Sequence, residues 1–570
     1  MQKRWNIKTP HPRLQVALSN ALNIHPLVAQ LLINRGIETS QQAEDFLTCS
    51  LKRLHDPFLL RDMDRAVVRI QQAKDKNELV LIFGDYDVDG VTSSVVLKNI
   101  LKKLGIQAIH YIPHRINEGY GLNPSIVEHV QRHGVRLLIT VDCGIGAFRE
   151  VEALNQAGVD VIIFDHHEPS GTPDPARTDG LLPRAVAIVD PKRRDCSYPF
   201  KGLASVGLMA KLHQALTGDI GEDCWDLVAI GTIADVAELT GENRIFVKNG
   251  LPKIHQTQNH GLKALLEMAR IKGKKKILPS YVGFILGPRI NATGRMGSAL
   301  DSLELLLSED PERALSLAKS LEEYNTSRQK IQNDIIEEAV SLVEREVNFN
   351  DHKVIVLNKE GWHKGVLGIV AARIMEKYNR PSIVISTELG IGMGSARSID
   401  GFHIFEALRH CAYHLENFGG HRRAAGLTLK EGNIESFRQS INAFARQQMR
   451  PEDLIPSLEL DAEIPLSMVD LNLAKAIESL EPYGEGNRPP LFCSRRLVVK
   501  TPAQILGRDT LKFWVTDGEK ILAAIGFGMG DFRDLVKPGG KVDLAYQIFI
   551  DDWEKEPTVS LKLKDLKPSP

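Results

Sequence analysis

The chain has 570 residues, of which 25% are charged and 43% are hydrophobic, and its formal net charge is −1. This length is enough for three or four domains of about 100–200 residues each. The near-neutral charge excludes a globally basic nucleic-acid-binding protein, so any site for a polyanion has to be a local patch.

The cysteines and the N-terminal segment indicate the cellular environment. The six cysteines are scattered and form no C-x-x-C pair, which argues against a zinc ribbon or a disulfide framework and favours a reducing compartment. The N-terminal segment MQKRWNIKTPHP has no apolar signal core, and no run of 18 or more apolar residues occurs. We therefore expect a cytoplasmic protein without a membrane-spanning segment.

Residues 79–190 alternate short apolar runs with amphipathic stretches, a rhythm typical of a parallel sheet covered by helices. The expected strands are 79–83, 107–112, 137–141, 160–164 and 185–189. The expected helices between them are 92–105, 124–134 and 148–158. In open α/β sheets of this kind the functional site lies beyond the carboxyl ends of the strands.

The rest of the chain falls into three further parts. Residues 201–238 have mainly helical patterns, and residues 300–345 form a long charged helical stretch that we interpret as a connector between two lobes. A second α/β rhythm begins at residue 353 and ends near residue 450. Residues 456–570 contain short strands with turn signals and no helical pattern, which predicts a small barrel or sandwich.

Three aspartates follow the first predicted strand on alternate positions. They are Asp85, Asp87 and Asp89 in the segment GDYDVDGVTSS. Like charges this close repel each other and resist burial unless positive charge lies among them. Taken alone, the segment is equally well explained as an Asp/Gly-rich surface turn.

Similar side chains follow two other strands and interrupt one hydrophobic stretch. Asp142 comes directly after residues 137–141, Asp165, His166 and His167 come after residues 160–164, and Asp235 lies within LVAIGTIADVAEL. Each alone could be a helix cap, a turn residue or an aspartate bonded to a backbone amide. Together at one sheet edge they would carry a negative charge that two divalent cations would neutralise.

The donor types indicate which metal and which chemistry to expect. Oxygen ligands with one or two imidazoles and no thiolates select Mn²⁺ or Mg²⁺ over zinc. Two such ions about 3.5–4 Å apart can activate a water molecule and stabilise the attacking and leaving oxygens of a phosphoryl displacement. The residues therefore predict a binuclear hydrolytic site.

The sequence resembles the DHH phosphoesterase superfamily in GDYDVDG at 84–90, VDCG at 141–144 and DHH at 165–167. Segments similar to the second lobe of that superfamily are GWHKGVLGIVAAR at 361–373, GSARS at 394–398 and FGGHRRAAG at 418–426. GPRINATGR at 287–295 and EPYGEGNRPPLF at 481–492 narrow the resemblance to the RecJ family of single-strand-specific 5′→3′ DNA exonucleases. The resemblance covers roughly residues 60 to 550 in the same motif order.

The resemblance implies an α/β protein in which a parallel-sheet DHH domain is joined by a long helix to a second α/β domain of the DHHA1 type, followed by a C-terminal β-barrel with the OB-fold. The predicted domains are an N-terminal helical segment 1–55, a DHH catalytic domain 56–245, a helical region with the connector helix 246–348, a DHHA1 substrate-binding domain 349–455 and an OB-fold domain 456–570.

The resemblance also implies roles for the acidic residues and histidines. The implied ligands of two metal ions are Asp85, Asp87, Asp89, Asp142, His166 and Asp235, with the alternative that Asp85 or Asp89 only orients a ligand. The implied catalytic residues are Asp87, Asp142, His166, His167 and Asp235. His167 remains open between a ligand, a proton donor to the leaving group, a contact to the scissile phosphate and a hydrogen bond to the strand edge. We favour a structural role for Asp165, which would hold the two histidines.

The implied substrate contacts lie mainly in the second lobe. By resemblance, Ser395 and Arg397 bind the 5′-end phosphate, while His421, next to Gly419 and Gly420, faces the scissile phosphate. Arg289, Asn291 and Arg295 would line a groove between the lobes as phosphate contacts. Trp362 and His363 would stack on a base, and a core anchor is the alternative for Trp362. Phe513, Trp514 and Trp553 are either stacking platforms on the barrel or part of its core.

By resemblance, the function is removal of 5′-mononucleotides from single-stranded DNA with Mn²⁺ or Mg²⁺ bound, in recombinational and mismatch repair. The implied partners of this monomer are a single-strand-binding protein and a RecQ-type helicase. Two alternatives stay open: another DHH-family phosphodiesterase that acts on short oligonucleotides, cyclic dinucleotides or pyrophosphate, and a non-catalytic single-strand-binding scaffold.

Overall fold

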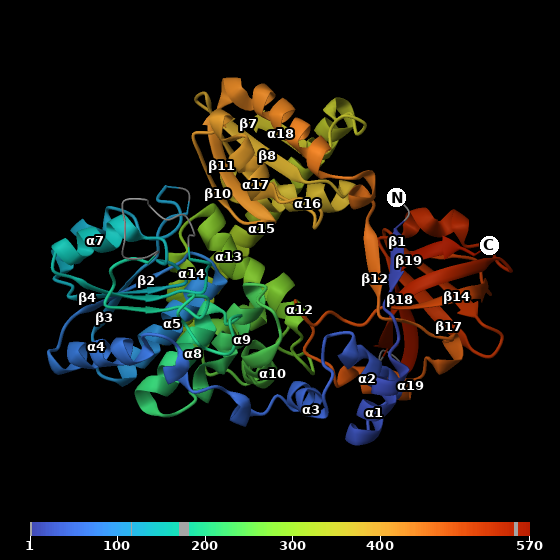
Figure 1. Ribbon diagram of the computed structural model, residues 1–570, viewed down its shortest axis with the longest axis horizontal. Coiled ribbons are helices and arrows are strands. Elements are labelled where there is room, and N and C mark those ends of the chain that lie inside the picture. The colour runs from blue at the N-terminus through green and yellow to red at the C-terminus, as the bar shows by residue number, and fades with distance from the viewer. Residues whose placement is uncertain (1–2, 116, 170–181, 552–556, 570) are drawn as a thin grey trace. The chain divides into compact units, whose positions relative to one another are not determined.

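The computed structural model describes residues 3–115, 117–169, 182–551 and 557–569. The chain divides into two compact units. The smaller unit combines Met1–Arg53 with Ile455–Pro570, and the larger unit is Leu54–Leu454 (Figure 1).

The first lobe of the larger unit is built on a parallel five-stranded sheet with the order β3-β2-β4-β5-β6. Its strands are β2 (Val80–Gly84), β3 (Ala108–Tyr111), β4 (Leu137–Val141), β5 (Asp160–Phe164) and β6 (Ala187–Val189). Every residue of β2 and β4 is buried, because helices cover both faces of the sheet. This double burial explains why the strands are continuous apolar runs, and the five predicted strands are confirmed.

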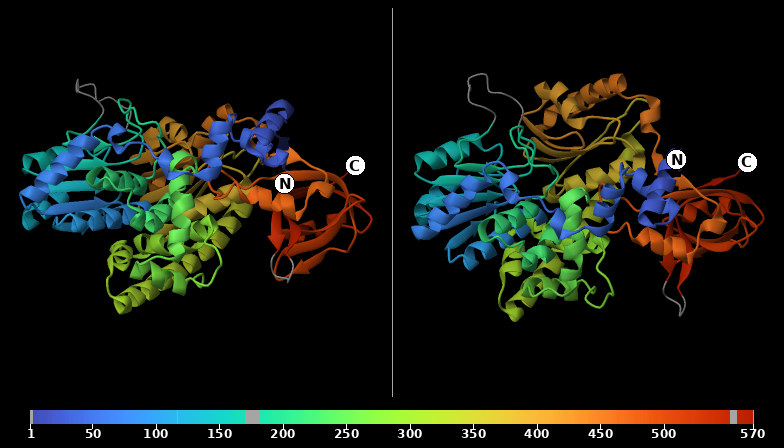
Figure 2. Two further views of the ribbon diagram at one scale, coloured as in Figure 1. Left: turned by 90° about the horizontal axis from the view of Figure 1, so that it is seen from below. Right: turned by 60° about the horizontal axis from the view of Figure 1, so that its bottom comes forward.

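Helices lie on both faces of this sheet (Figure 2). On one face, α6 (Ile126–His133) and α7 (Phe148–Gln156) contribute to a hydrophobic core with side chains of β2, β4 and β5. On the other face lie α4 (Met63–Asp75) and α5 (Val88–Lys103). Since α5 begins directly after β2, the aspartate-rich segment forms the turn between them at the carboxyl edge of the sheet.

A helical region follows this sheet and leads to the second lobe. Its helices are α8 (Ser205–Thr217), α9 (Trp225–Ala234), α10 (Gly241–His255), α11 (His260–Met268), α12 (Pro279–Tyr281), the π-helical turn η4 (Val282–Leu286), α13 (Gly287–Met296), α14 (Leu300–Leu307) and α15 (Pro311–Glu346). The 36-residue helix α15 packs against α11 and α13 and then enters the core of the second lobe through Ile335, Ala339 and Val343. It is therefore the connector that the charged helical pattern predicts, except that residues 300–307 of the predicted stretch form the separate helix α14 and the connector begins at Pro311.

The second lobe has a mixed five-stranded sheet with the order β10-β11-β9-β8-β7. Its elements are β7 (Ile355–Glu360), α16 (Leu367–Tyr378), β8 (Ser382–Glu388), β9 (Ile391–Arg397), α17 (Ile404–His410), β10 (Asn417–Gly420), β11 (Ala424–Lys430) and α18 (Ile434–Gln448). Only β7 and β8 pair in parallel, and β8, β9, β11 and β10 form antiparallel pairs. This arrangement brings the end of β9 beside the start of β11, just after the loop that carries His421.

The smaller unit contains a seven-stranded sheet with the order β13-β14-β18-β19-β17-β16-β15. Its strands are β13 (Ala462–Glu463), β14 (Phe492–Val499), β15 (Gln504–Leu506), β16 (Thr510–Thr516), β17 (Ile521–Phe527), β18 (Lys541–Asp551) and β19 (Thr558–Pro568). A second pairing of β14, with β16, curls the sheet toward a closed barrel. The predicted C-terminal barrel is thus close to the observed structure.

The same unit contains the N-terminal segment, which is predicted to be helical and comprises α1 (Pro12–Leu22), α2 (Pro26–Ile33) and α3 (Ser40–Thr48). Three further elements were not indicated by the sequence patterns: β1 (Arg4–Ile7), β12 (Ser457–Leu460) and the helix α19 (Leu471–Glu478). β1 pairs in parallel with β12, about 450 residues away, and α2 packs into the barrel core through Leu27, Val28 and Leu31. A pairing over such a separation leaves no local sequence signal.

In the described part of the chain, no single helix has the length and apolar composition to cross a membrane. Only the pair α1 and α2 satisfies both criteria when the two helices are taken together, and they are bent by 117°.

A fully buried ion pair connects helices α8 and α10 of the helical region. Lys211 Nζ lies 2.6 Å from Glu242 Oε1, and each side chain is only 1% exposed. Lys211 also donates to the His55 carbonyl at 2.7 Å, while Glu242 accepts from the His55 N–H at 2.9 Å and from the Tyr198 hydroxyl at 2.5 Å. All charges in this network therefore have partners, which a buried pair requires.

We expect Lys211→Met to lower the thermal midpoint of the larger unit strongly, since it leaves the Glu242 carboxylate buried without its counter-ion. The typical loss for one broken buried pair is about 3–5 kcal/mol. The double variant Lys211→Met/Glu242→Leu should recover part of that loss, because it removes both charges. Scanning calorimetry of both variants checks this, with the exposed Lys319→Met on α15 as the control; a double variant no more stable than the single one would contradict it.

Candidate metal centre and phosphate pocket

The structure brings all six predicted metal ligands to the carboxyl edge of the first sheet. Their ligand atoms form overlapping groups in which all atoms lie within 4.8 Å of one another. The groups are Asp142, His166 and His167; Asp89, His166 and Asp235; and Asp85, Asp87 and Asp142. Because the strands are parallel, residues that follow different strands meet at one place.

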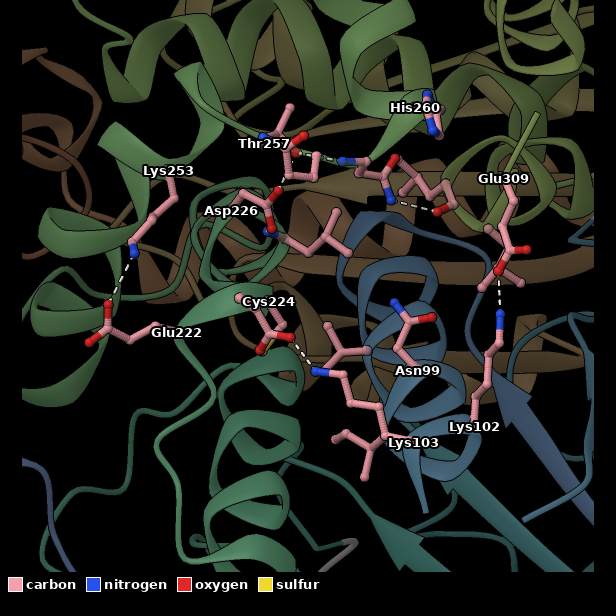
Figure 3. Close-up of a pocket in the computed structure, with 18 of the residues that line it drawn as sticks. Asn99, Lys102, Lys103, Glu222, Cys224, Asp226, Lys253, Thr257, His260 and Glu309 are labelled. Carbon is pink, nitrogen blue, oxygen red and sulfur yellow. Dashed lines mark hydrogen bonds and ion pairs between the residues drawn. The ribbon is translucent and has the colours of Figure 1, made fainter. Parts of the chain in front are cut away.

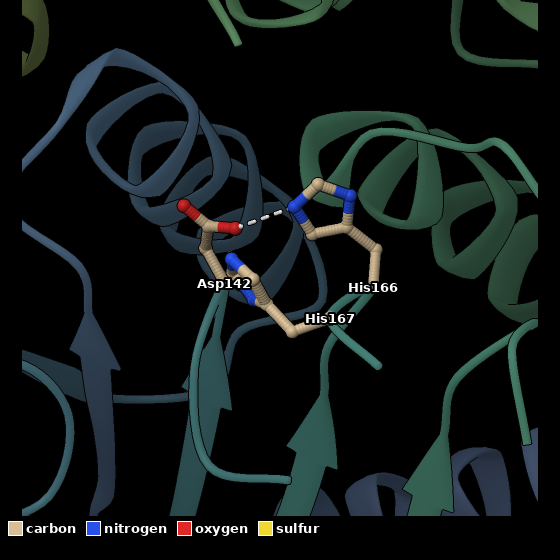
Figure 4. Close-up of side chains that lie close together, drawn as sticks. All are labelled: Asp142, His166 and His167. Atoms are coloured by element: carbon tan, nitrogen blue, oxygen red, sulfur yellow. Dashed lines mark ion pairs between the residues drawn. The ribbon is translucent and has the colours of Figure 1, made fainter. Parts of the chain in front are cut away.

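His166 lies between the carboxylates of three different elements. Its Nε2 atom is 3.1 Å from Asp142 Oδ1, a contact drawn as a dashed line in Figure 4. The same nitrogen is 3.9 Å from Asp89 Oδ2 and 3.9 Å from Asp235 Oδ2. His166 therefore connects the groups, and a cation near its Nε2 would have oxygen atoms of these aspartates around it.

Backbone amides position two of the aspartates. Asp87 caps α5, where its Oδ1 accepts from the N–H groups of Asp89 at 3.0 Å and Gly90 at 3.1 Å. Asp89, which is fully buried, accepts from the N–H groups at the start of α8, those of Ser205 at 2.7 Å and Val206 at 2.9 Å. Each carboxylate is thus fixed by a helix N-terminus before any cation binds.

Asp165 accepts four hydrogen bonds, three of which hold the histidine pair. Its Oδ1 accepts from the N–H of His166 at 2.8 Å and of His167 at 3.1 Å and lies 2.7 Å from His167 Nδ1, while its Oδ2 accepts from Ile145 N–H at 2.9 Å. This arrangement supports the structural role favoured for Asp165. Burial alone would lower the pKa of His167, but the bond to Asp165 and its charge raise that pKa to about 9.

Burial and mutual repulsion dominate the electrostatics of the other groups. Burial, followed by the charges of neighbouring aspartates, raises the pKa values of Asp85, Asp142 and Asp235 well above the ordinary range and that of Asp89 to about 7. Burial, followed by the charge of His167, lowers the pKa of His166 to about 3, so its imidazole is neutral. Neutral imidazole and clustered carboxylates are the forms that bind metal.

Unpartnered buried atoms test whether a divalent cation fits. Among the described residues, Asp85 Oδ1, Asp142 Oδ1 and His166 Nε2 are buried and have no hydrogen-bond partner. Buried polar atoms rarely stay unsatisfied. The three atoms belong to the metal-ligand groups, and their donor types suit Mn²⁺ or Mg²⁺.

The backbone is strained where two of these ligands lie. Asp142 has φ 65°, and Val236, directly after Asp235, has φ 61°. Aspartate tolerates this left-handed conformation, but it is unfavourable for the β-branched valine. Such strain is often found at functional sites, where the surrounding structure enforces it.

A group of arginines forms the second half of the site. Arg295 Nη1 donates to the Gly365 carbonyl at 3.0 Å, and Arg397 Nη1 donates to Ser395 Oγ at 3.2 Å. Arg328 is bound by amides of its own helix, and Arg115 lies 4.6 Å above the ring of Tyr86. Within the residues that the structure describes, none of these four guanidinium groups pairs with a carboxylate.

The arginines repel one another, as the aspartates do. Burial, followed by the charges of Arg115, Arg328 and Arg397, lowers the pKa of Arg295 to about 9. Arg295 and Arg328 line a small cavity of about 210 Å³ together with Asn291, Ala234 and Ile369. Ala234 directly precedes the candidate ligand Asp235, so this cavity begins next to the metal centre. The uncompensated positive charge of the arginines next to the metal centre fits a bound phosphate.

Two glycines on the second lobe allow the backbone to pack closely against the arginines. A Cβ atom on Gly365 would lie 2.2 Å from the Arg295 carbonyl oxygen. A Cβ atom on Gly368 would lie 2.8 Å from Arg397 Nη2 and 3.1 Å from Ser395 Oγ. The predicted pair Ser395 and Arg397 is therefore packed directly against the N-terminal part of α16.

His421 lies in the loop after β10. Its N–H donates to the Ala424 carbonyl at 2.8 Å, and Gly420 before it has φ 143°, where a Cβ atom would lie 2.4 Å from the same oxygen. Burial, then the charges of His167 and Lys192, lowers the pKa of His421. Two first-lobe cations thus act on a second-lobe histidine, which agrees with its predicted position opposite the metal centre.

Three predicted substrate contacts are placed differently. Trp362 is 4% exposed, packs in the core of the second lobe and donates from its indole N–H to Glu338 at 2.8 Å, so its predicted stacking on a base is wrong and the core-anchor alternative holds. Arg289 pairs with Glu322 of α15 at 2.5 and 3.1 Å and is not a free phosphate contact. His363 Nδ1 accepts from Gly365 N–H at 3.1 Å and so fixes a turn.

Of the suggested barrel platforms, Phe513 is 1% exposed and belongs to the core, whereas Trp514 is 41% exposed. Trp553 lies outside the described residues. Sequence reasoning missed Arg115, Arg328 and Lys192. The last follows a strand end in VDPKRR, so the rule that identified the aspartates could have found it.

A larger cavity of about 830 Å³ lies at the C-terminal end of α5 and contains none of the predicted site residues (Figure 3). Its rim carries ion pairs of Lys102 with Glu309, Lys103 with Asp223 and Lys253 with Glu222. Each of these three lysines is thus paired with a carboxylate, so among the described residues the rim offers no free lysine to a phosphate.

Comparisons with known proteins agree with this geometry. Residues 79–232 match the DHH family, N-terminal domain, residues 351–447 match the DHHA1 domain, and residues 460–565 match the RecJ OB domain. The single-stranded-DNA-specific exonuclease RecJ of Bacillus subtilis is 38% identical over 565 residues, which cover 99% of this chain and 70% of that protein. RecJ of Escherichia coli is 31% identical over 569 residues, 95% of this chain and 96% of that one.

Solved structures show the same fold. The crystal structure of RecJ from Thermus thermophilus in complex with Mn²⁺ has a TM-score of 0.84 and 28% sequence identity, and the match covers 100% of this chain and 80% of that chain. The Mg²⁺ complex has a TM-score of 0.77. The chain therefore belongs to the RecJ family of single-stranded-DNA-specific exonucleases.

Proposed function

We propose that this chain is a metal-dependent exonuclease that removes nucleotides from the 5′ end of single-stranded DNA. The observation that carries this proposal is that a cluster of carboxylates and a cluster of arginines lie directly next to each other. Buried carboxylates that require cations lie beside unpaired arginines that require an anion, and Ala234 links them. A phosphorylated chain end is a ligand that satisfies both.

The arginine pocket suits a terminal phosphate better than an internal one. A phosphate monoester carries about −1.5 to −2 charge near neutral pH, whereas a phosphodiester carries a single charge. Arg115, Arg295, Arg328 and Arg397 converge with no carboxylate partner in the described part of the chain, so the pocket favours the more highly charged group. Ser395 adds a hydroxyl beside Arg397. Binding energy thus selects the chain end.

With the 5′-phosphate in this pocket, the next linkage lies toward the metal centre. Hydrolysis there adds water to phosphorus and breaks the bond to O3′ of the terminal nucleotide, which leaves as a 5′-mononucleotide. The phosphate remains on the next nucleotide as a new 5′-phosphate. The product is therefore again a substrate for the same pocket.

The six candidate ligands have the donor set and spacing for two divalent cations, Mn²⁺ or Mg²⁺. When bound, such cations supply Lewis acidity to the phosphate and an activated water. Two cations would leave the five carboxylates of the centre with one uncompensated negative charge. The fold itself contributes helix N-termini that hold Asp87 and Asp89 and the Asp165 bonds that hold the histidines.

His167 and His421 approach the scissile phosphate from opposite lobes in this proposal. Because Nδ1 of His167 is held by Asp165, the Nε2–H of the protonated ring remains to donate to a phosphate oxygen or to the leaving O3′. His421 sits on the other side, within the electrostatic reach of His167.

The smaller unit supports a substrate with unpaired bases. Trp514 on β16 and Phe527 on β17 are 41% and 63% exposed, and Lys562 lies 5.5 Å above the Phe527 ring. Aromatic faces beside lysines bind single strands through base stacking and phosphate contacts. Three further parts of the proposal rest on the family alone. They are a role in recombination and mismatch repair, partnership with a single-strand-binding protein and a RecQ-type helicase, and the state of a cytoplasmic monomer.

We expect Asp142→Asn to abolish nucleotide release and to weaken Mn²⁺ binding strongly. Asparagine keeps the shape and tolerates the φ of 65° at this position, so the fold should survive while the anionic ligand is lost. The measurements are release from a 5′-labelled 70-mer with and without EDTA and Mn²⁺ titration calorimetry. Asp223→Asn, on the rim of the distant cavity, is the control. Wild-type activity in EDTA, or full turnover by Asp142→Asn, would refute the assignment.

Arg397→Ala should reduce the preference for 5′-phosphate over 5′-hydroxyl ends on the order of 10- to 100-fold, the usual value of one charged hydrogen bond. The rate on 5′-hydroxyl ends should change much less. The check is kcat/KM on a matched pair of single strands. Arg423→Ala serves as the control, since that guanidinium pairs with Asp400 on the same lobe. Equal loss on both substrates would remove Arg397 from the terminal pocket.

Gly368→Ala should reproduce part of the Arg397→Ala effect without loss of stability. The new methyl group would displace the Arg397 guanidinium, whose Nη2 atom lies 2.8 Å from the Cβ position. Alanine is also the better helix former by about 0.8–1.0 kcal/mol, and Gly368 lies within α16. Thermal unfolding and the 5′-phosphate preference, measured on one preparation, separate the two effects; an unchanged preference would show that the pocket does not depend on this close approach.

A further inference from the structure

The loop after β6 lies beside the histidine-bearing loop after β5. The two strands are parallel neighbours in which Phe164 is opposite Val189, and the Asp165 N–H donates to the Val189 carbonyl at 3.2 Å. Asp190 follows β6 directly and is fully buried. The segment Asp190–Lys192 therefore lies at the same sheet edge as the metal centre.

Asp190 fixes the backbone of this segment. Its Oδ1 atom accepts from the Lys192 N–H at 2.7 Å, a turn in which an aspartate bonds the amide two residues ahead. Lys192 is thereby held in a defined place, two residues beyond the strand end. Neither residue belongs to the six candidate metal ligands.

The Lys192 ammonium has only a loose partner. Its Nζ atom is 3.9 Å from Oε1 of Glu168, the residue after His167. This separation exceeds a hydrogen bond, and the Glu168 side chain is 65% exposed while that of Lys192 is 29% exposed. Among the residues described, the ammonium has no hydrogen-bond partner. A partly buried cation with such weak pairing is available to an anionic ligand.

The surroundings of Lys192 identify that anion. Burial is the largest influence on the pKa values of His166, Asp235 and His421, and the charge of Lys192 adds a smaller lowering contribution at each of the three groups. His166 and Asp235 belong to the first lobe, and His421 belongs to the second lobe. The proposed function places the scissile phosphate between these two lobes. Lysine, a compact and flexible point charge, suits a single phosphate oxygen.

We propose that Lys192 is a further catalytic residue whose ammonium contacts a non-bridging oxygen of the scissile phosphate and leaves Glu168 when DNA binds. This inference rests on the proposed function. As water adds to phosphorus and the bond to O3′ breaks, negative charge grows on the phosphate oxygens, and Lys192 stabilises it without gaining or losing a proton. The single negative charge that two cations leave in the centre is balanced by the same ammonium.

The rival explanation is that Lys192 only holds the loop in place through Glu168. The two explanations differ in what Glu168→Gln does. If the ion pair with Glu168 is what matters, Glu168→Gln must reproduce the loss caused by Lys192→Met. If the ammonium acts on the phosphate, Glu168→Gln leaves kcat within about threefold of wild type, because it only frees the lysine.

The experiment measures kcat and KM on a 5′-phosphorylated single strand, with Mn²⁺ titration of each variant. We expect Lys192→Met to lower kcat on the order of 10²-fold, the usual effect of removing one donor to the transition-state charge. KM and Mn²⁺ affinity should change less than about threefold, since the arginines and the carboxylates are intact. Lys192→Arg should recover at least tenfold of the loss. Lys253→Met, at the rim of the distant cavity, is the control.

Three results would overturn the inference: wild-type kcat in Lys192→Met, an equal loss in Glu168→Gln, or loss of Mn²⁺ binding together with kcat. Failure of the proposed function is a different outcome, because the wild-type protein itself would then release no mononucleotides from the single strand.

Discussion

Repulsion among buried carboxylates is the constraint on which the site depends. Five aspartates and a neutral imidazole share one sheet edge, and burial with mutual repulsion raises the pKa of Asp142 and Asp235. The fold holds the carboxylates by using the N-termini of α5 and α8 to bind Asp87 and Asp89. Among the described residues it leaves Asp142 Oδ1 and His166 Nε2, which are 3.1 Å apart, without hydrogen-bond partners, and divalent cations bound there would relieve the remaining repulsion.

The position of the metal centre was largely predictable from the sequence, because the first sheet is parallel. Because successive strands end at one edge, residues far apart in the chain, such as Asp85, Asp142 and His166, could be placed together from the positions of the strand ends alone. The strands themselves were clear, because burial on both faces makes them continuous apolar runs. The long connector was clear as well, since its periodicity extends over 36 residues without a breaker.

Features that depend on tertiary pairing were not predictable. An arginine in a basic motif can be free or paired, and the sequence does not distinguish Arg295, which lines the cavity, from Arg289, which pairs with Glu322 of α15. An indole at a helix start can face solvent or core, and Trp362 faces the core. The pairing of β1 with β12 joins segments with no local signal.

The two sites divide the chemistry between them. A binuclear metal centre hydrolyses phosphodiesters without regard to position, so it alone would give an endonuclease as readily as an exonuclease. In the proposed function the arginines supply the missing information, since Arg295 and Arg397 lose favourable solvation on burial and would regain it best from the more highly charged terminal phosphate. Directional degradation then needs no moving part, because each hydrolysis creates a new 5′-phosphate for the same pocket. In this proposal the position of the arginine pocket determines the direction of degradation. The metal centre hydrolyses the linkage that lies next to the 5′-phosphate bound in that pocket.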